Sequence, residues 1–223
     1  MTIDRRSFVK TSVGMLGATA IAPAFAESLG KLANPLRVGV VGCGRQGRAI
    51  VAELASFADV EIVGLCDTEP RRLDAAKRRA RDVTGYATHA DLLDAASPDA
   101  VFVATPTHLH RGIVEDALSA DVSVYCEAPL AHSADDARAI AAAARNATAK
   151  FQSGYLARVN PVYDLARSFF RSDAVRDVVS MQASRARKTP WRTPARTAEQ
   201  EKLLNWRLDP EVTTGLSGEW GSH

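Results

Sequence analysis

Short apolar runs separated by amphipathic stretches make up most of this 223-residue sequence. Runs of five to seven mostly aliphatic residues predict buried strands at 37–41, 60–66, 100–104 and 122–126. A further strand is predicted at 150–155, and a short one at 86–87. Helices are predicted between them, at about 48–54, 69–83, 91–94, 109–120 and 133–145, the last capped by Ser133. Strands alternating with helices favour parallel βαβ units, which bind ligands at the carboxyl ends of their strands.

The pattern changes after residue 155. An amphipathic helix is predicted at 161–170, an alternating antiparallel strand at 175–184 and a short helix at 199–206, with no closing element after it. The loop at 185–196 is basic and contains Trp191. One tryptophan does not make a stacking platform for nucleic acid, so we interpret this segment as a surface loop or the flank of an active site.

A glycine-rich turn follows the first predicted strand, where Gly42, Gly44 and Gly47 form the pattern G-x-G-x-x-G. The first glycine permits a tight turn, the second lets a pyrophosphate approach the backbone, and the third lets the next helix pack closely against the strand. Asp67 ends the second strand 20 residues after Gly47, where a ribose-binding carboxylate is expected. The pattern predicts a dinucleotide site. The alternative is a phosphate-free strand–turn–helix in which Asp67 caps a helix.

Asp67 also bears on the choice of cofactor. Its carboxylate would accept hydrogen bonds from the adenosine ribose of NAD and repel the 2′-phosphate of NADP, so NAD is expected rather than NADP. Arg71 and Arg72 argue the other way, because either could pair with that phosphate.

The composition is that of an ordinary globular protein, with 46% hydrophobic and 24% charged residues. Residues 1–26 resemble a twin-arginine export signal, with Arg5 and Arg6 before a short apolar stretch and a small-x-small cleavage site ending at Ala26. We therefore expect a periplasmic or secreted protein; the alternative is a disordered or amphipathic N-terminal segment. The stretch is too short and too rich in glycine to span a bilayer. Residues 1–26 hold three of the 28 basic and one of the 26 acidic residues, so the rest of the chain has as many basic as acidic residues. This balance of charge does not suggest nucleic acid or an anionic membrane as a partner.

Neither the cysteines nor the histidines suggest a metal site. Cys43, Cys66 and Cys126 lack C-x-x-C spacing, and we interpret them as small apolar residues beside the ligand crevice. No pair of histidines has metal-ligand spacing, and we interpret His89, His108 and His132 as surface or capping residues.

Five separate stretches resemble the Gfo/Idh/MocA oxidoreductases over about residues 36–223. They are the turn at 39–47, A-T-P-x-x-x-H from 104 to 110, E-A-P-L at 127–130 in place of the family's E-K-P-L, Q-S-G-Y at 152–155 with Arg158 and Asn160, and N-W-R-L-D at 205–209 leading through Gly215 to Glu219 and His223.

The resemblance implies an α/β fold: a Rossmann NAD(P)-binding domain at 35–155, followed at 156–223 by the start of an α+β substrate domain with an open mixed sheet. It implies hydride transfer to or from a sugar or polyol, with Glu219 and His223 as catalytic residues. It also implies a cis peptide before Pro129 and a crevice-facing His110. The implied cofactor-binding residues are Gly42, Gly44, Arg45, Gln46, Gly47, Asp67, Thr105, Pro106, His110 and Glu127.

Two residues and the length depart from the family pattern. Ala128 occupies the position of the catalytic lysine, and Glu219 stands where aspartate is usual. Family members continue well past the histidine, so we expect a C-terminally truncated domain, without the sheet that often forms the subunit interface, and a family-typical homo-oligomer is doubtful. The alternatives to a dehydrogenase are a non-catalytic dinucleotide-binding module and an NAD-dependent, redox-neutral glycosidase or epimerase.

Overall fold

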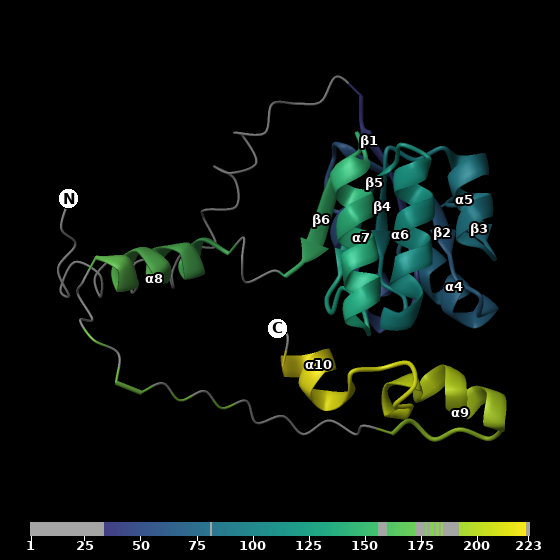
Figure 1. Ribbon diagram of the computed structural model, residues 1–223. Coiled ribbons are helices and arrows are strands. Elements are labelled where there is room, and N and C mark those ends of the chain that lie inside the picture. The colour runs from purple at the N-terminus through teal and green to yellow at the C-terminus, as the bar shows by residue number, and fades with distance from the viewer. Residues whose placement is uncertain are drawn as a thin grey trace. The chain divides into compact units, whose positions relative to one another are not determined.

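The computed structural model describes residues 34–80, 82–155, 160–172, 177, 179–180, 182, 184 and 192–221 (Figure 1). These residues fall into two compact units, one holding 34–155 with 192–221 and the other the described residues between 160 and 184. The predicted export signal and most of the basic loop lie outside the described residues. Within the described part of the chain, no helix is long and apolar enough to cross a membrane.

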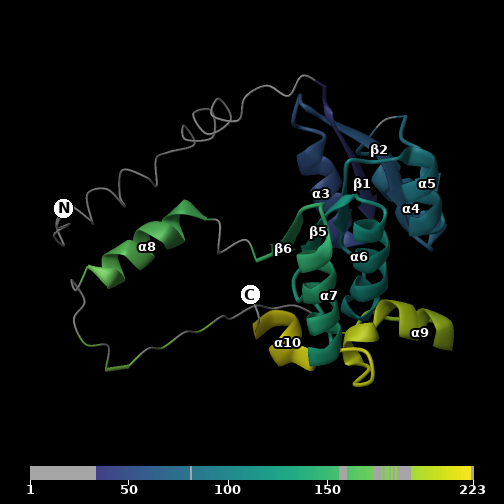
Figure 2. The same ribbon diagram turned by 45° about the horizontal axis from the view of Figure 1, so that its top comes forward.

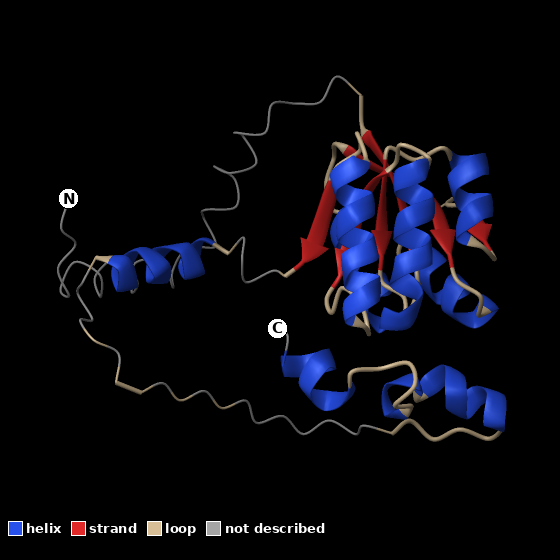
Figure 3. Cartoon of the chain, in the orientation of Figure 1, coloured by secondary structure: helices blue, strands red, loops and turns tan. Residues whose placement is uncertain are grey.

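A six-stranded parallel sheet forms the centre of the first unit, with the strand order β3-β2-β1-β4-β5-β6. Figure 3 shows the strand arrows pointing the same way, so that their carboxyl ends share one edge. The chain reverses its direction of progression between β1 and β4, and such a switch point is where sheets of this topology bind ligands. The strands are β1 (Leu36–Val41), β2 (Val60–Cys66), β3 (Gly85–Tyr86), β4 (Ala100–Val103), β5 (Ser123–Glu127) and β6 (Phe151–Gly154).

Helices cover both faces of this sheet. Valines of β1 pack with Val51 and Leu54 of α3 (Arg45–Leu54) and with α4 (Pro70–Lys77) on one face. The other face packs against α5 (His89–Ala96), α6 (His110–Ser119) and α7 (Ala134–Asn146), which lie in front of the strands in Figure 1, whereas α3 comes into view in Figure 2. Burial on both sides accounts for the continuous apolar runs in the strands.

Local capping explains where several of these helices begin. The Ser133 hydroxyl accepts a hydrogen bond from the N–H of Asp136 at 3.1 Å, which confirms the predicted cap of α7. Thr88 caps α5 in the same way, through the N–H of Asp91. The helix predicted at 69–83 is shorter, because α4 ends at Lys77 and the chain turns, with Asp82 at a φ of 59°.

The C-terminal segment, 192–221, contains α9 (Ala198–Leu204), the 3₁₀ turn η3 (Trp206–Leu208) and α10 (Gly215–Gly221). Asn205 holds the start of this segment, because its amide accepts from the N–H of Thr193 and donates to the Thr193 carbonyl oxygen and to Glu201. The prediction that no element follows residue 206 was wrong, since α10 forms there.

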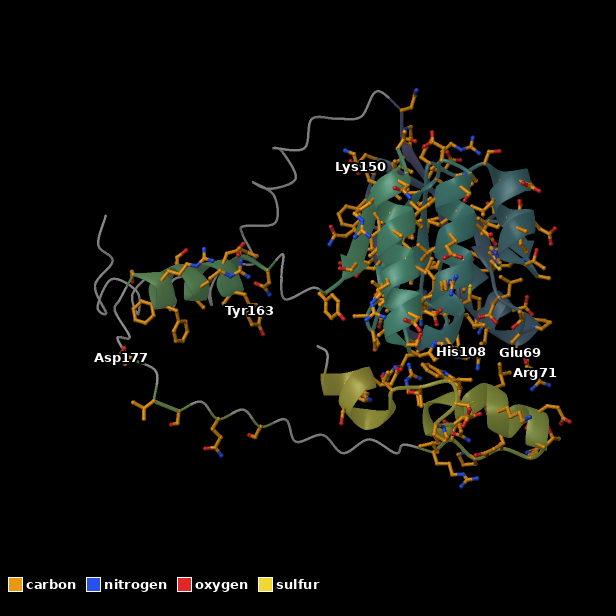
Figure 4. The ribbon with its side chains drawn as sticks, in the orientation of Figure 1. Glu69, Arg71, His108, Lys150, Tyr163 and Asp177 are labelled. Carbon is orange, nitrogen blue, oxygen red and sulfur yellow. The ribbon has the colours of Figure 1, made fainter. Side chains whose placement is uncertain are left out.

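In the second unit, α8 (Pro161–Arg171) begins at Asn160, whose side chain accepts from the N–H of Val162 at 2.9 Å. This confirms the helix predicted at 161–170. None of its side chains is buried; Tyr163, labelled in Figure 4, is 56% exposed. The strand predicted at 175–184 lies largely outside the described residues, and those of its residues that are described, such as Asp177, are not in a strand.

Candidate functional site

The glycine turn lies at the carboxyl edge of the sheet between β1 and α3. The N–H of Gly42 donates to the Cys66 carbonyl of β2, and the N–H of Ala104 donates to the Val41 carbonyl of β1. Gly42 has a φ of 94°, and a Cβ there would lie 2.7 Å from the carbonyl of Ala104. A Cβ on Gly47 would lie 1.7 Å from the Gly42 carbonyl oxygen. The fold therefore requires glycine at both of these positions.

Gly44 differs from the other two glycines of the turn, because a Cβ there would meet nothing within 4 Å. The fold does not explain this glycine, but close approach of a ligand to the backbone does. Gly44 is also the N-cap of α3, which has no side-chain cap and no acidic residue in its first turn. The open backbone and the positive end of the helix dipole fit the pyrophosphate of a dinucleotide.

Asp67 lies directly behind this turn and is 9% exposed. Its Oδ2 accepts a hydrogen bond from the N–H of Cys43 at 2.7 Å, and its Oδ1 accepts from the N–H of Glu69 at 2.8 Å. The carboxylate thus ties the glycine turn to the end of β2. It does not cap α4, whose N-cap is Glu69 and which has no side-chain cap. Contact between Asp67 and a ribose remains a prediction.

The three cysteines are free and buried beside this turn and at the ends of β2 and β5. Burial raises the pKa of the Cys43, Cys66 and Cys126 thiols to about 12, with the neighbouring carboxylates adding to the effect. They are therefore neutral thiols at physiological pH and pack as small apolar residues. Among the described residues, no group of three or more histidine, cysteine or acidic side chains could hold a metal ion.

The expectation that His110 faces the crevice was wrong. The side chain is 1% exposed, with Nε2 3.0 Å from the Thr105 carbonyl oxygen and Nδ1 3.2 Å from that of Leu130. Burial lowers the pKa of this imidazole below its usual range, against the opposing effect of the carbonyl oxygens. His110 therefore joins the loops that follow β4 and β5.

Thr105 and Pro106 follow β4 at this edge, and both are half-buried. The Thr105 hydroxyl is buried and has no hydrogen-bond partner in the described part of the chain. Such an oxygen is a candidate contact for a ligand.

Glu127 ends β5 and faces the glycine turn. Its Oε1 accepts a hydrogen bond from Nε2 of Gln46 at 3.0 Å, so two predicted cofactor-binding residues meet across the switch point. Burial raises the pKa of the adjacent Tyr125 phenol to about 12, and the Glu127 charge contributes. The next residue, Ala128, is half-buried and precedes Pro129 through a cis peptide bond, which confirms the expected isomer.

Glu219 of α10 is buried, whereas the other predicted catalytic residue, His223, lies outside the described residues. Oε1 of Glu219 accepts from the hydroxyls of Thr107 and Thr213 at 3.0 and 3.3 Å. Its Oε2 lies 3.4 Å from Nε of Arg207, so the carboxylate is engaged on both sides.

His108 joins the same edge to η3. Its ring makes an edge contact with Trp206, with centroids 5.9 Å apart, and lies 6.4 Å from the ring of His132. Nδ1 of His108 is buried without a hydrogen-bond partner in the described residues, and burial lowers the pKa of this ring. His108 and Glu69 are both labelled at this edge in Figure 4. The interpretation of His108 as a surface residue was therefore incomplete.

Sequence reasoning missed Thr107, Trp206 and Arg207 as parts of this site. The sequence did contain signals for these residues. Thr107 lies four residues beyond the end of β4, and Trp206 and Arg207 belong to the motif N-W-R-L-D. No periodicity links residues 107 and 219, which are 112 positions apart.

Comparisons with known proteins agree with this geometry. The model of an oxidoreductase family with an NAD-binding Rossmann fold matches residues 36–155. Inositol 2-dehydrogenase 1 of Saccharopolyspora erythraea is 30% identical over 187 residues, covering 79% of this chain and 56% of that protein. The chain thus spans little more than half the length of this relative.

Two solved structures extend the comparison. Myo-inositol 2-dehydrogenase from Lactobacillus plantarum superposes with a TM-score of 0.61 at 26% identity, covering 66% of this chain and 44% of that one. Scyllo-inositol dehydrogenase from Lactobacillus casei, solved with bound NAD(H) and scyllo-inositol, gives a TM-score of 0.58 at 26% identity, covering 65% and 43%.

Proposed function

The chain belongs to the Gfo/Idh/MocA oxidoreductase family, and we propose that it serves as an NAD-dependent oxidoreductase for a sugar or polyol. The observation that carries the proposal is the glycine turn, with its open backbone at Gly44 and the Asp67 carboxylate behind it. The inositol dehydrogenases among its relatives support a polyhydroxylated substrate.

The residues of this edge suit separate parts of NAD. The turn from Gly42 to Gly47 and the start of α3 would hold the pyrophosphate, and Asp67 the adenosine ribose. Thr105, Pro106, Gln46 and Glu127 would line the part of the site nearer the nicotinamide, at the ends of β4 and β5. When bound, the cofactor supplies the hydride acceptor or donor.

Proton transfer is the step that the described residues serve least well. A lysine at position 128 could hydrogen-bond a reacting hydroxyl, and alanine cannot. Positioned acid–base groups contribute about 10²–10⁴-fold to rates. Glu219 is already held by two hydroxyls and a guanidinium. Proton transfer would therefore fall to His223, with slow turnover as the consequence.

Ala128 is also the observation that favours the second candidate, a dinucleotide-binding module without net oxidation, or a redox-neutral enzyme that keeps its NAD. In both, the cofactor site is required and the lysine is dispensable.

The test is a comparison of the full chain with Ala128→Lys. Both are titrated with NAD by calorimetry and assayed for NADH formation against a panel of sugars and polyols. A dehydrogenase site lacking one group predicts unchanged NAD affinity and faster NADH formation in the lysine variant. NAD binding without any gain in turnover would favour the second candidate, and no NAD binding by either chain would refute both.

Residues 1–26 support a further proposal, export by the twin-arginine route to the periplasm or beyond. Replacing both Arg5 and Arg6 by lysine should leave the precursor in the cytoplasm in a fractionation experiment. Undiminished export of that variant would argue against the proposal.

A further inference from the structure

We propose that Tyr125 is a positioning residue: its phenol, together with the side-chain amide of Gln46, orients the Glu127 carboxylate toward the nicotinamide or the adjoining ribose of the dinucleotide. The proposal deepens the proposed function and rests on it, because it requires NAD to bind at the carboxyl edge of the sheet.

Tyr125 and Glu127 lie on the same face of β5, since they are two residues apart in one strand. Cys126, between them, points to the opposite face and packs into the core formed with α6 and α7. The Tyr125 ring packs against Phe102 of β4, with ring centroids 5.2 Å apart, and Phe102 packs against the core on the α3 side. Tyr125 therefore lies on the face of the sheet that α3 covers, and α3 is the helix that carries Gln46.

Gly154 of the neighbouring strand β6 leaves room for the phenol. It is the register partner of Glu127. A Cβ on Gly154 would lie 2.9 Å from the Tyr125 hydroxyl oxygen and also 2.9 Å from the Cα of Glu127. The hydroxyl thus occupies the space that a side chain at position 154 would fill, directly beside Glu127. From there it forms a hydrogen bond with the Glu127 side chain.

Gln46 supplies the second donor to the same carboxylate. Its Nε2 donates to Oε1 of Glu127 at 3.0 Å. One donor therefore comes from β5 and the other from α3. An ionised carboxylate offers about four lone-pair sites, so two donors leave sites for ribose hydroxyls or for the carboxamide of nicotinamide. Fixing the carboxylate before the ligand arrives lowers the entropic cost of binding.

The protonation state of Tyr125 fits a positioning role. Burial raises the pKa of its phenol to about 12, and both the charge of Glu127 and the hydrogen bond to it act in the same direction. Tyr125 is therefore a neutral hydrogen-bond donor at physiological pH and not a base. It acts through Glu127, without touching the reacting atoms.

The experiment uses the full chain and compares Tyr125→Phe, which removes only the hydroxyl, with Tyr86→Phe as the matched control. Tyr86 is also half-buried, and it belongs to β3, at the opposite edge of the same sheet from β6. Calorimetry measures the binding of NAD, of ADP-ribose, which lacks the nicotinamide, and of ADP, which also lacks the second ribose. Thermal melting of each variant establishes that it folds.

Tyr125→Phe should weaken NAD binding by about tenfold, near the lower end of the range for a hydrogen bond to a charged group, and leave ADP binding unchanged. Binding of ADP-ribose then locates the contact. A loss equal to that of NAD assigns Glu127 to the ribose, whereas unchanged binding assigns it to the nicotinamide. Tyr86→Phe should leave the ratio of NAD affinity to ADP affinity as it is in the unmodified chain.

A double-mutant cycle separates positioning from a merely structural role. Glu127→Ala should weaken NAD binding at least as much as Tyr125→Phe does, and adding Tyr125→Phe to it should have no further effect, because Tyr125 acts only through Glu127. A structural role would instead lower Tm, weaken ADP as well as NAD, and add to the effect of Glu127→Ala.

An unchanged ratio of NAD affinity to ADP affinity in folded Tyr125→Phe would overturn the proposal, as would additive losses with Glu127→Ala or an equal loss in Tyr86→Phe. These results also distinguish the inference from the function on which it rests. If the unmodified chain binds no NAD, the proposed function fails and the inference fails with it. If the chain binds NAD and Tyr125→Phe leaves the ratio unchanged, only the inference fails.

Discussion

Replacing Gly47 by alanine tests whether the glycine turn is shaped by the fold. The new Cβ would lie 1.7 Å from the Gly42 carbonyl oxygen and 2.9 Å from its carbonyl carbon, whereas real Cβ contacts are essentially never shorter than 3.0 Å. The obstacle is backbone, so α3 has to move away from β1. Overpacking costs about 1–3 kcal/mol where neighbours can adjust, and we expect about 3 kcal/mol or more here. For a chain of this size that lowers Tm by about 6–12 °C.

Two other glycines provide matched controls of the same chemical size. A Cβ on Gly44 meets nothing within 4 Å, and the residue has a φ of −64°. Gly44→Ala should therefore melt like the unmodified chain yet bind NAD poorly, because the methyl group occupies the space that we assign to the pyrophosphate. Gly112 is exposed within α6 and equally unobstructed, so Gly112→Ala should stabilise the fold by about 0.5–1 kcal/mol and leave binding unchanged.

Circular-dichroism melting and calorimetric titration with NAD separate the three outcomes. A Gly47→Ala protein that melts within a degree or two of the unmodified chain would refute the steric reasoning. Full NAD affinity in Gly44→Ala would refute the assignment of the open backbone to the cofactor, whatever the melting temperatures.

Three further substitutions test contacts around the site. Burial lowers the pKa of His110 below its unfolded value of 6.5. The free energy of unfolding should therefore be constant above about pH 7 and should decrease as the pH falls below 6.5, by at most about 1.4 kcal/mol per pH unit. In His110→Gln, the urea midpoints measured at pH 7 and pH 5 should converge. Asp67→Asn keeps one acceptor oxygen for two N–H donors, so it should lower the free energy of unfolding measured with urea by about 1–3 kcal/mol and weaken NAD binding. An unchanged urea midpoint would contradict the role of Asp67 in the turn. Thr107→Val removes the hydroxyl bonded to Glu219, so the backbone amides of 206–221 should exchange hydrogen faster while those of the glycine turn are unaffected. Unchanged exchange rates in 206–221 would show that the contact is dispensable.

The fold of residues 34–155 was largely predictable because its sequence signals are local. Apolar runs with helical segments between them give the order of strands and helices, and glycine spacing gives the turn at β1. The direction of a side chain is a different matter. His110 begins α6 just after β4, but its ring is buried against the carbonyl oxygens of Thr105 and Leu130 instead of facing the crevice.

The helix α10 of the C-terminal segment could not be predicted from local sequence patterns. G-L-S-G-E-W-G has three glycines in seven residues and little intrinsic tendency to form a helix, so no element was predicted there. The helix α10 forms because tertiary contacts outweigh propensity: Glu219 is buried against Thr107, and Arg207 pairs with it from η3. The contact between Thr107 and Glu219 joins residues 112 positions apart, and no pattern within either segment encodes it.

The environment of Glu219 also limits the chemistry that this residue can perform. Its carboxylate accepts hydrogen bonds from two hydroxyls and pairs with a guanidinium, so both of its oxygens are already engaged by the protein. A substrate hydroxyl would have to displace one of these contacts, which hold α10 in place, before it could bind the carboxylate. Glu219 is therefore better suited to positioning the C-terminal segment over the nucleotide site than to exchanging protons with a substrate. With Ala128 in the lysine position, the acid–base group has to come from beyond this pair, and a bound NAD without rapid turnover is the behaviour that these residues predict.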